Sequence, residues 1–403
     1  MRTRTVVGVL VASAVVVVAQ HSVALSMRRP DPGSGAPRPV VDAPRKTSTS
    51  PANASATCAQ RTLSGMSLAK QVGQLFVAGV SSTSPTPEEL GVIRHRHLGG
   101  VILFGHNDIG VTATRAVTRR LQSQATPTTT DGVKLWISAD QEGGLVQSLK
   151  GPGFSTIPTA LTQGSWPRAT LQTRSERWGS QLSAAGVNLD LAPVADTVPQ
   201  RLGTANAPIG YYDREYGHRP KVVARHVTAV IDGLRAAGVQ ATAKHFPGLG
   251  RVRRNTDTSA GVTDSVTTRR DPYLLPFERA VADHVPVVMV SLATYTRIDP
   301  GHLAAFSPVV MDMLRHDLGF SGVVISDSMT AVAVQSVPAG ARAVRFLRAG
   351  GTVALSVDTA TTTAMVAAVL AHAQSNAHFR ATVRSDALIV LKEKHRIGLL
   401  SCR

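Results

Sequence analysis

Residues 319–329 read GFSGVVISDSM, and the fold that we predict rests on the pattern inside this stretch. The apolar run at 322–326 is rich in β-branched residues and has the length of a buried strand. Gly319 lies just before it, at the position where glycine commonly ends a helix. The run then stops at a carboxylate, Asp327. A helix, a buried strand and a polar strand end, in this order, are typical of α/β domains with a parallel sheet.

The same pattern recurs along most of the chain. Seven further apolar runs of strand length lie at 74–80, 100–104, 135–138, 187–192, 239–243, 285–291 and 352–356. The intervals hold amphipathic stretches of helix length, for example at 174–185, 222–237, 276–283 and 309–318. Glycine stands just past several of these stretches, as Gly186, Gly238, Gly319 and Gly350. Eight such units predict a single (β/α)8 barrel of the TIM type. A doubly wound sheet is the alternative, but no strand is followed by a G-x-G-x-x-G turn.

Composition limits the classes of function. The chain has 403 residues, of which 43% are hydrophobic, so it can bury a large core and is not a disordered chain. Only 4% of the residues are aromatic, which argues against nucleic acid as a partner, because single-strand readers stack bases on aromatic rings. The formal net charge of +17 favours attraction to an anionic cell wall or membrane surface. The alternative explanation of this charge is a general bias toward arginine on a solvated surface.

The N-terminal region predicts export. Residues 1–26 contain Arg2 and Arg4 before an apolar run, 6–19, that is shorter than the roughly 20 residues of a membrane-spanning helix. This pattern is typical of a secretory signal, with an uncleaved membrane anchor as the alternative. We therefore expect an extracellular, wall-bound or membrane-tethered protein. Residues 27–57 are rich in Pro, Ser and Thr and predict a disordered linker, which leaves 58–403 as the folded barrel.

The chain has two cysteines, Cys58 and Cys402, at opposite ends of the predicted barrel. Disulfides persist in oxidising compartments, so an exported domain with this arrangement is expected to join its ends through one bond. Two free thiols are the alternative.

Polar residues gather where the predicted strands end. In a barrel of this type the carboxyl ends of the strands carry the active site. The residues that follow these strands include Asp140, Glu142, Asp196, Lys244, His245 and Asp327. A single aspartate at such a position is often only a helix N-cap, but several charged groups on one rim predict a functional pocket. The chain lacks H-E-x-x-H and G-x-S-x-G, so paired carboxylates with neighbouring cations favour glycoside hydrolysis without a metal or cofactor.

Five segments together resemble a known family. They are LGGVILFGHN (98–107), ISADQEGG (137–144), LDLAPVAD (189–196), KHFPG (244–248) and GFSGVVISDSM (319–329). In this order they are similar to family 3 glycoside hydrolases, specifically the bacterial β-N-acetylglucosaminidase branch, over almost all of residues 65–360. The resemblance implies a TIM barrel that releases terminal β-linked N-acetylglucosamine with retention, often from muropeptides and other cell-wall fragments, and needs no metal.

The resemblance also implies roles for single residues. Asp327 resembles the family's nucleophile, which forms a covalent glycosyl-enzyme, with a helix N-cap as the alternative for this residue. Asp140, Lys244 and His245 resemble the residues that bind the hydroxyl groups of the terminal sugar. Arg214 resembles a sugar-binding arginine, with a surface salt bridge to a neighbour in its own segment as the alternative.

The chain departs from the family in the loop after the fifth strand. There the branch carries Asp-Ser-His, in which the histidine is the acid/base, whereas this chain has Asn255, Thr256 and Asp257. We therefore predict that Asp257 is the catalytic acid/base, with a turn-capping role as the alternative. The loss of the histidine leaves two further functions open: a catalytically weak sugar-binding protein of the same fold, and a β-glucosidase of the same family.

Overall fold

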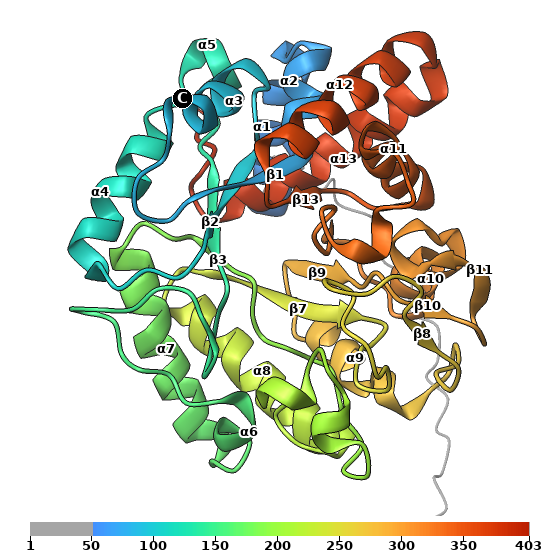
Figure 1. The fold of residues 1–403 in the computed structure, drawn as a ribbon. Helices are drawn as coiled ribbons and strands as arrows, with labels where there is room; N and C mark the ends of the chain where they lie inside the picture. The colour runs from blue at the N-terminus through green and yellow to red at the C-terminus, as the bar shows by residue number, and fades with distance from the viewer. Residues whose placement is uncertain (1–50, 403) are drawn as a thin grey trace, which may run out of the picture. The chain divides into compact units, whose positions relative to one another are not determined.

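A computed structural model describes residues 51–402 of the chain, and for residues 51–57 it describes the backbone alone. Eight parallel strands within this range form one sheet, in the order in which they occur along the chain (Figure 1). They are β1 (Phe76–Ser81), β2 (Gly100–Phe104), β3 (Trp136–Ala139), β6 (Leu189–Asp190), β7 (Gln240–Phe246), β9 (Val287–Val290), β12 (Val323–Ser326) and β13 (Ala354–Ser356). Each of the eight predicted strands is present.

The sheet closes on itself almost completely. The last strand, β13, pairs with β1 in parallel register, with Phe76 opposite Ala354. On its other side it reaches β12 through a bridge between Val353 and Ile325. An open doubly wound sheet would leave two free edges, so the predicted TIM-type barrel is confirmed and the alternative is wrong.

Helices connect successive strands on the outside of the barrel (Figure 1). The main connecting helices are α3 (Pro87–His95), α4 (Gly110–Gln122), α7 (Arg168–Ala184), α8 (Pro220–Ala236), α9 (Leu275–Ala282), α10 (Pro308–Asp312) and α11 (Ala339–Ala349). Two further helices, α12 (Thr359–Ser375) and α13 (Ala377–Arg396), follow the last strand, β13. The predicted helix at 309–318 is in fact α10 followed by a π-helical turn, Met313–Asp317. The four glycines expected to end helices all have positive φ, as at Gly238 (74°) and Gly350 (111°), a conformation that residues with a Cβ rarely adopt.

The other helices and strands precede the barrel strands or lie in the loops between them, and all except α1 are short. They are α1 (Pro51–Gly65), α2 (Leu68–Gly73), α5 (Pro127–Thr130), α6 (Ala160–Gln163), β4 (Gln141–Gly143), β5 (Val146–Gln147), β8 (Thr263–Asp264), β10 (Thr294–Tyr295) and β11 (Asp299–Leu303). The barrel strands themselves are buried along almost their whole length, as in β3, β9 and β12. Burial on both faces explains why these strands occur in the sequence as continuous apolar runs rather than as alternating patterns.

Helix α1 begins at Pro51, inside the segment for which we predicted a linker (27–57). The composition of 51–57, PANASAT, explains the difference: three alanines favour helix, and proline is well suited to a first helical turn. The predicted signal at 1–26 and the rest of the linker lie outside the described residues. Within residues 51–402, no helix is both long enough and apolar enough to cross a membrane.

A disulfide joins Cys58 in α1 to Cys402, which lies beyond the end of α13. The two Cα atoms are 5.8 Å apart, although 344 positions separate the residues in sequence. Helices α1 and α13 also pack against each other. The bond therefore fixes the two ends of the barrel to one another.

We expect the Cys58→Ser/Cys402→Ser double variant to unfold more easily than the wild type. A crosslink across so long a loop restricts the unfolded chain, and its loss is expected to lower the free energy of unfolding by about 3–5 kcal/mol. Urea titration followed by circular dichroism measures this change. Reduced wild-type protein should match the double variant. An unchanged midpoint in both samples would show that the bond does not stabilise the barrel.

Candidate active site

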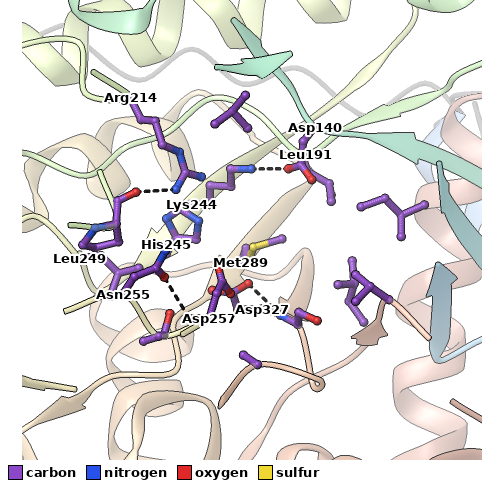
Figure 2. A pocket seen from close by; sticks show the side chains of 18 of the residues that line it. Asp140, Leu191, Arg214, Lys244, His245, Leu249, Asn255, Asp257, Met289 and Asp327 are labelled. Atoms are coloured by element: carbon purple, nitrogen blue, oxygen red, sulfur yellow. Dashed lines mark hydrogen bonds and ion pairs between the residues drawn. The ribbon is translucent and has the colours of Figure 1, made fainter. Parts of the chain in front are cut away.

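A cavity with a volume of about 500 Å³ opens at the carboxyl ends of the strands. Its walls come from the ends of β2, β3, β7, β12 and β13 and from the loops that follow them. All six residues predicted for catalysis and sugar binding line it, namely Asp140, Arg214, Lys244, His245, Asp257 and Asp327 (Figure 2). Residues that are up to 187 positions apart in sequence, from 140 to 327, therefore meet in one site.

The polar side of the cavity is a network of alternating charges. The Nζ atom of Lys244 lies 2.6 Å from both Asp140 Oδ1 and Glu142 Oε1. The guanidinium of Arg214 donates to both oxygens of Glu142, from Nε at 2.8 Å and from Nη2 at 2.7 Å. The partner of Arg214 is thus Glu142, across the cavity wall, rather than a neighbour in its own segment. Because the Lys244 and Glu142 side chains are almost fully buried, the network holds its geometry without substrate.

Burial alone would raise the pKa of Glu142, but the positive charges of Arg214 and Lys244, with their hydrogen bonds, outweigh it. Together they lower the Glu142 pKa to about 2. Burial likewise acts to lower the pKa of Lys244, and the carboxylates of Asp140 and Glu142 reverse this and raise it. Lys244 is therefore a fixed cation and hydrogen-bond donor rather than a proton-transfer group.

We expect Glu142→Gln to lower the free energy of unfolding by about 3 kcal/mol at pH 7, because the pKa of Glu142 is well below its value in the unfolded chain. Glu142 has a pKa of about 2 in the fold against an ordinary value of 4.5. Its contribution is therefore complete above pH 4.5 and decreases as pH falls toward 2. The difference between variant and wild type should shrink to about half at pH 3.

Urea unfolding of both proteins at the two pH values measures this change. Glu88→Gln is the matched control, because Glu88 is an exposed carboxylate in the first turn of α3. A loss for Glu142→Gln that is equal at pH 7 and pH 3 would contradict the electrostatic explanation.

Asp196 positions His245. It is fully buried, and its Oδ2 lies 2.7 Å from Nδ1 of His245. Its other oxygen accepts hydrogen bonds from the backbone N–H groups of His245 and Leu249, at 3.2 and 2.7 Å. Since Nδ1 is engaged, Nε2 is the ring nitrogen left for a substrate hydroxyl. The same carboxylate therefore fixes both the ring of His245 and the start of the loop that follows.

Lys244 and His245 are consecutive, yet both line the cavity. In a regular strand their side chains would point to opposite faces. The pairing of β7 with β9 shifts register between Lys244 and Phe246, and this irregularity turns both side chains inward.

Asp327 directly follows β12, on the opposite side of the cavity from Arg214 (Figure 2). Its backbone N–H donates to Val290 O at 3.0 Å, and its Oδ1 accepts from the N–H of Ser328 at 2.8 Å. No helix begins at this point, and the chain passes through a turn to the short 3-10 helix η6 (Val332–Val334). The N-cap explanation for Asp327 therefore does not apply, and its half-buried carboxylate is free to face a substrate.

The loop that carries Asp257 is docked over the Asp327 side of the cavity. The backbone N–H of Val332 donates to Asp257 O at 3.2 Å, and that of Ala333 donates to Thr256 O at 3.1 Å. Asn255 Oδ1 accepts from the N–H of Asp257 at 2.9 Å and shapes the turn. The turn-forming contact thus belongs to Asn255, which leaves the Asp257 carboxyl available to the cavity.

The pKa of Asp257 is raised to about 6. The main cause is partial desolvation of the carboxyl by the surrounding protein, although the residue keeps contact with solvent. The negative charge of Asp327 raises the pKa further. The charges of Arg214 and His245 act against this shift but do not cancel it. Two arginines of the loop itself are engaged elsewhere. Arg251 pairs with Asp271 at 2.7 Å, and Arg254 donates to Gly261 O at 2.7 Å. A carboxyl of this kind can hold a proton near neutral pH and release it to a leaving oxygen.

Glu142, Asp196 and Asp190 shape the site, but the sequence assigned them no role. Asp190 is buried at the end of β6, accepts from the N–H of Gln141 at 3.1 Å, and has its pKa raised to about 8 by burial. Asp190 ends β6, whereas Glu142 and Asp196 lie in the segments after β3 and β6. Their places after predicted strands put Glu142 and Asp196 on the rim, and this was the one signal for them in the sequence. Their partners could not be predicted, because each partner lies on a different strand or loop.

A parallel barrel whose rim holds two carboxyl groups in different environments, beside fixed donors for hydroxyl groups, has the site of a glycoside hydrolase. Residues 67–386 match the model of the glycosyl hydrolase family 3 N terminal domain. The chain belongs to this family, as the sequence motifs predicted, and it is an enzyme that cleaves glycosidic bonds.

Individual relatives agree with this assignment. A Beta-hexosaminidase from Stenotrophomonas maltophilia (strain R551-3) is 32% identical over 279 residues, which cover 65% of this chain and 76% of the relative. The crystal structure of the Beta-N-acetylhexosaminidase from Beutenbergia cavernae DSM 12333 is 46% identical with a TM-score of 0.81, and the match covers 82% of this chain and 99% of that one. A family 3 beta-N-acetylglucosaminidase from Paenibacillus sp. str. FPU-7 has a TM-score of 0.77 at 29% identity, covering 84% and 64%.

Proposed function

We propose that this enzyme is a retaining β-N-acetylhexosaminidase that releases terminal β-linked N-acetylglucosamine through a covalent glycosyl-aspartate. The observation that carries the proposal is the pair Asp327 and Asp257 in one cavity, the latter with its pKa raised to about 6. The names of the relatives, Beta-hexosaminidase and Beta-N-acetylhexosaminidase, support the choice of sugar.

Each group in the cavity has a task in this reaction. Asp140, Lys244 and Arg214 bind hydroxyl groups of the terminal sugar, and Nε2 of His245 accepts a hydrogen bond from a further hydroxyl, since Nδ1 carries the proton that bonds Asp196. Asp327 attacks the anomeric carbon and displaces the leaving oxygen, which takes the proton of Asp257. Asp257 then removes a proton from water, and the resulting hydroxide releases the sugar from Asp327.

Release of 4-nitrophenol from its β-N-acetylglucosaminide tests the proposal, with the β-glucoside as comparison. We expect the N-acetylglucosaminide to be the better substrate, and NMR of the first product should show the β-anomer. Saturable sugar binding without turnover would instead indicate a sugar-binding protein. Preference for the glucoside would indicate a β-glucosidase, and an α-anomer would exclude the covalent route.

We further propose that the protein is exported and acts on peptidoglycan fragments. Support comes from the predicted signal at 1–26, from the bond between Cys58 and Cys402, a type that is rare in the cytosol, and from the charge of +17. Fractionation of cells and product analysis on a defined disaccharide muropeptide test these points. Retention on isolated cell walls should fall as salt rises if charge attracts the protein to them.

A further inference from the structure

Exposed apolar side chains mark one side of the cavity mouth. Among the residues whose side chains the structure describes, five large hydrophobic ones are exposed, namely Phe104, Leu145, Tyr211, Val266 and Val309. Two of these, Phe104 and Leu145, also line the catalytic cavity. Phe104 is 53% exposed and Leu145 is 65% exposed. Large apolar groups that stay in water at the edge of a polar site point to a ligand that covers them.

The two side chains stand on one connected wall. Phe104 is the last residue of β2, and Leu145 lies in the turn between β4 and β5. The chain after β2 is bonded to the chain after this hairpin, since Asn107 N–H donates to Ser148 O at 2.9 Å and Lys150 N–H donates to Asn107 O at 2.8 Å. The two segments that carry these residues are therefore joined by backbone hydrogen bonds, although the side chains of Phe104 and Leu145 are open to solvent.

The charged side of the cavity already has its own occupant in the proposed reaction. The cations Lys244 and Arg214 are paired with carboxylates and lie in the wall, where they are suited to the hydroxyl groups of the terminal sugar. The anomeric carbon of that sugar must lie at Asp327. With the terminal sugar placed there, the leaving group beyond the scissile bond has the rest of the cavity available to it, and Phe104 and Leu145 line this part.

A pyranose ring has hydroxyl groups around its edge and C–H groups on its faces. An aromatic ring and a branched aliphatic side chain remove such a face from water without requiring a charge on it. We infer that Phe104 and Leu145 form the surface that binds the ring of the leaving sugar. The inference rests on the proposed function. It predicts in addition that the enzyme distinguishes substrates with a sugar leaving group from substrates without one.

Comparison of two substrates with equally unactivated leaving groups tests the inference. N,N′-diacetylchitobiose loses a sugar ring, whereas the methyl β-N-acetylglucosaminide loses only methanol. We expect the Phe104→Ala/Leu145→Ala double variant to lose on the order of 10-fold in kcat/KM on the disaccharide, since two apolar contacts disappear. Its kcat/KM on the methyl glycoside should stay within about 2-fold of the wild type. Phe104→Tyr, which keeps the aromatic ring, should retain the preference.

Val309→Ala is the matched control, because Val309 is exposed on α10 and does not line the cavity. It should leave both substrates unaffected. Equal losses of the double variant on both substrates would overturn the inference, since the two side chains would then contact the terminal sugar or support the site itself. Unchanged kinetics on both would overturn it as well. A wild-type enzyme that cleaves neither substrate would instead contradict the proposed function.

Discussion

Asp327→Asn is expected to lower kcat by on the order of 10⁴-fold or more on every N-acetylglucosaminide, including those with a phenol leaving group. The amide has nearly the same shape as the carboxylate but cannot form the glycosyl bond. Activation of the leaving group does not help, because the lost step is the attack on the anomeric carbon. Steady-state kinetics with the 4-nitrophenyl substrate and with N,N′-diacetylchitobiose measure the effect.

Two further measurements separate a nucleophile from a carboxylate that only supports the site. The wild type, stopped during turnover, should carry one N-acetylglucosaminyl group on the peptide that contains Asp327. Asp317→Asn is the control, because Asp317 is an exposed aspartate paired with Arg269 and should keep full activity. An Asp327→Asn protein that retains more than about a tenth of the wild-type kcat would exclude Asp327 as the nucleophile.

The barrel could be predicted because its main determinant is local. Each strand, buried on both faces, is a continuous apolar run, and positive-φ glycines such as Gly238 mark where helices end. The bounds of the elements were harder to predict, because they depend on hydrogen bonds to neighbours. The apolar run at 187–192 contributes only Leu189–Asp190 to the sheet, and the run at 239–243 extends to Phe246.

Of the site, only the residues that follow the predicted strands could be identified from the sequence. The carboxyl ends of parallel strands meet at one rim, so the sequence alone predicts that Asp140, Lys244 and Asp327 lie together. The partners of these residues are set by side-chain reach across the cavity. The two hydrogen bonds from Arg214 to Glu142, for instance, join residues 72 positions apart in sequence. Such pairs have no local pattern and emerge only from the folded geometry.

Asp257→Ala is expected to affect substrates according to their leaving group. A sugar alkoxide is a poor leaving group and needs a proton, so kcat/KM on N,N′-diacetylchitobiose should fall by on the order of 10²-fold or more. A 4-nitrophenolate leaves without a proton, so formation of the glycosyl-enzyme should change by less than about 10-fold in a single-turnover experiment. Thr258→Ala, an exposed neighbour in the same loop, is the control and should not discriminate between the two.

The pH dependence of the wild type gives an independent measure of the same role. Asp257 has a pKa raised to about 6, mainly by the surrounding protein and then by the charge of Asp327. The protonated form donates to the leaving oxygen, so kcat/KM on the disaccharide should be highest below pH 6 and fall tenfold per pH unit above it. This alkaline decrease should be absent from the Asp257→Ala variant. Equal losses on both substrates, with the decrease retained, would move the acid role to another group, and His245 is the next candidate because it lines the same cavity.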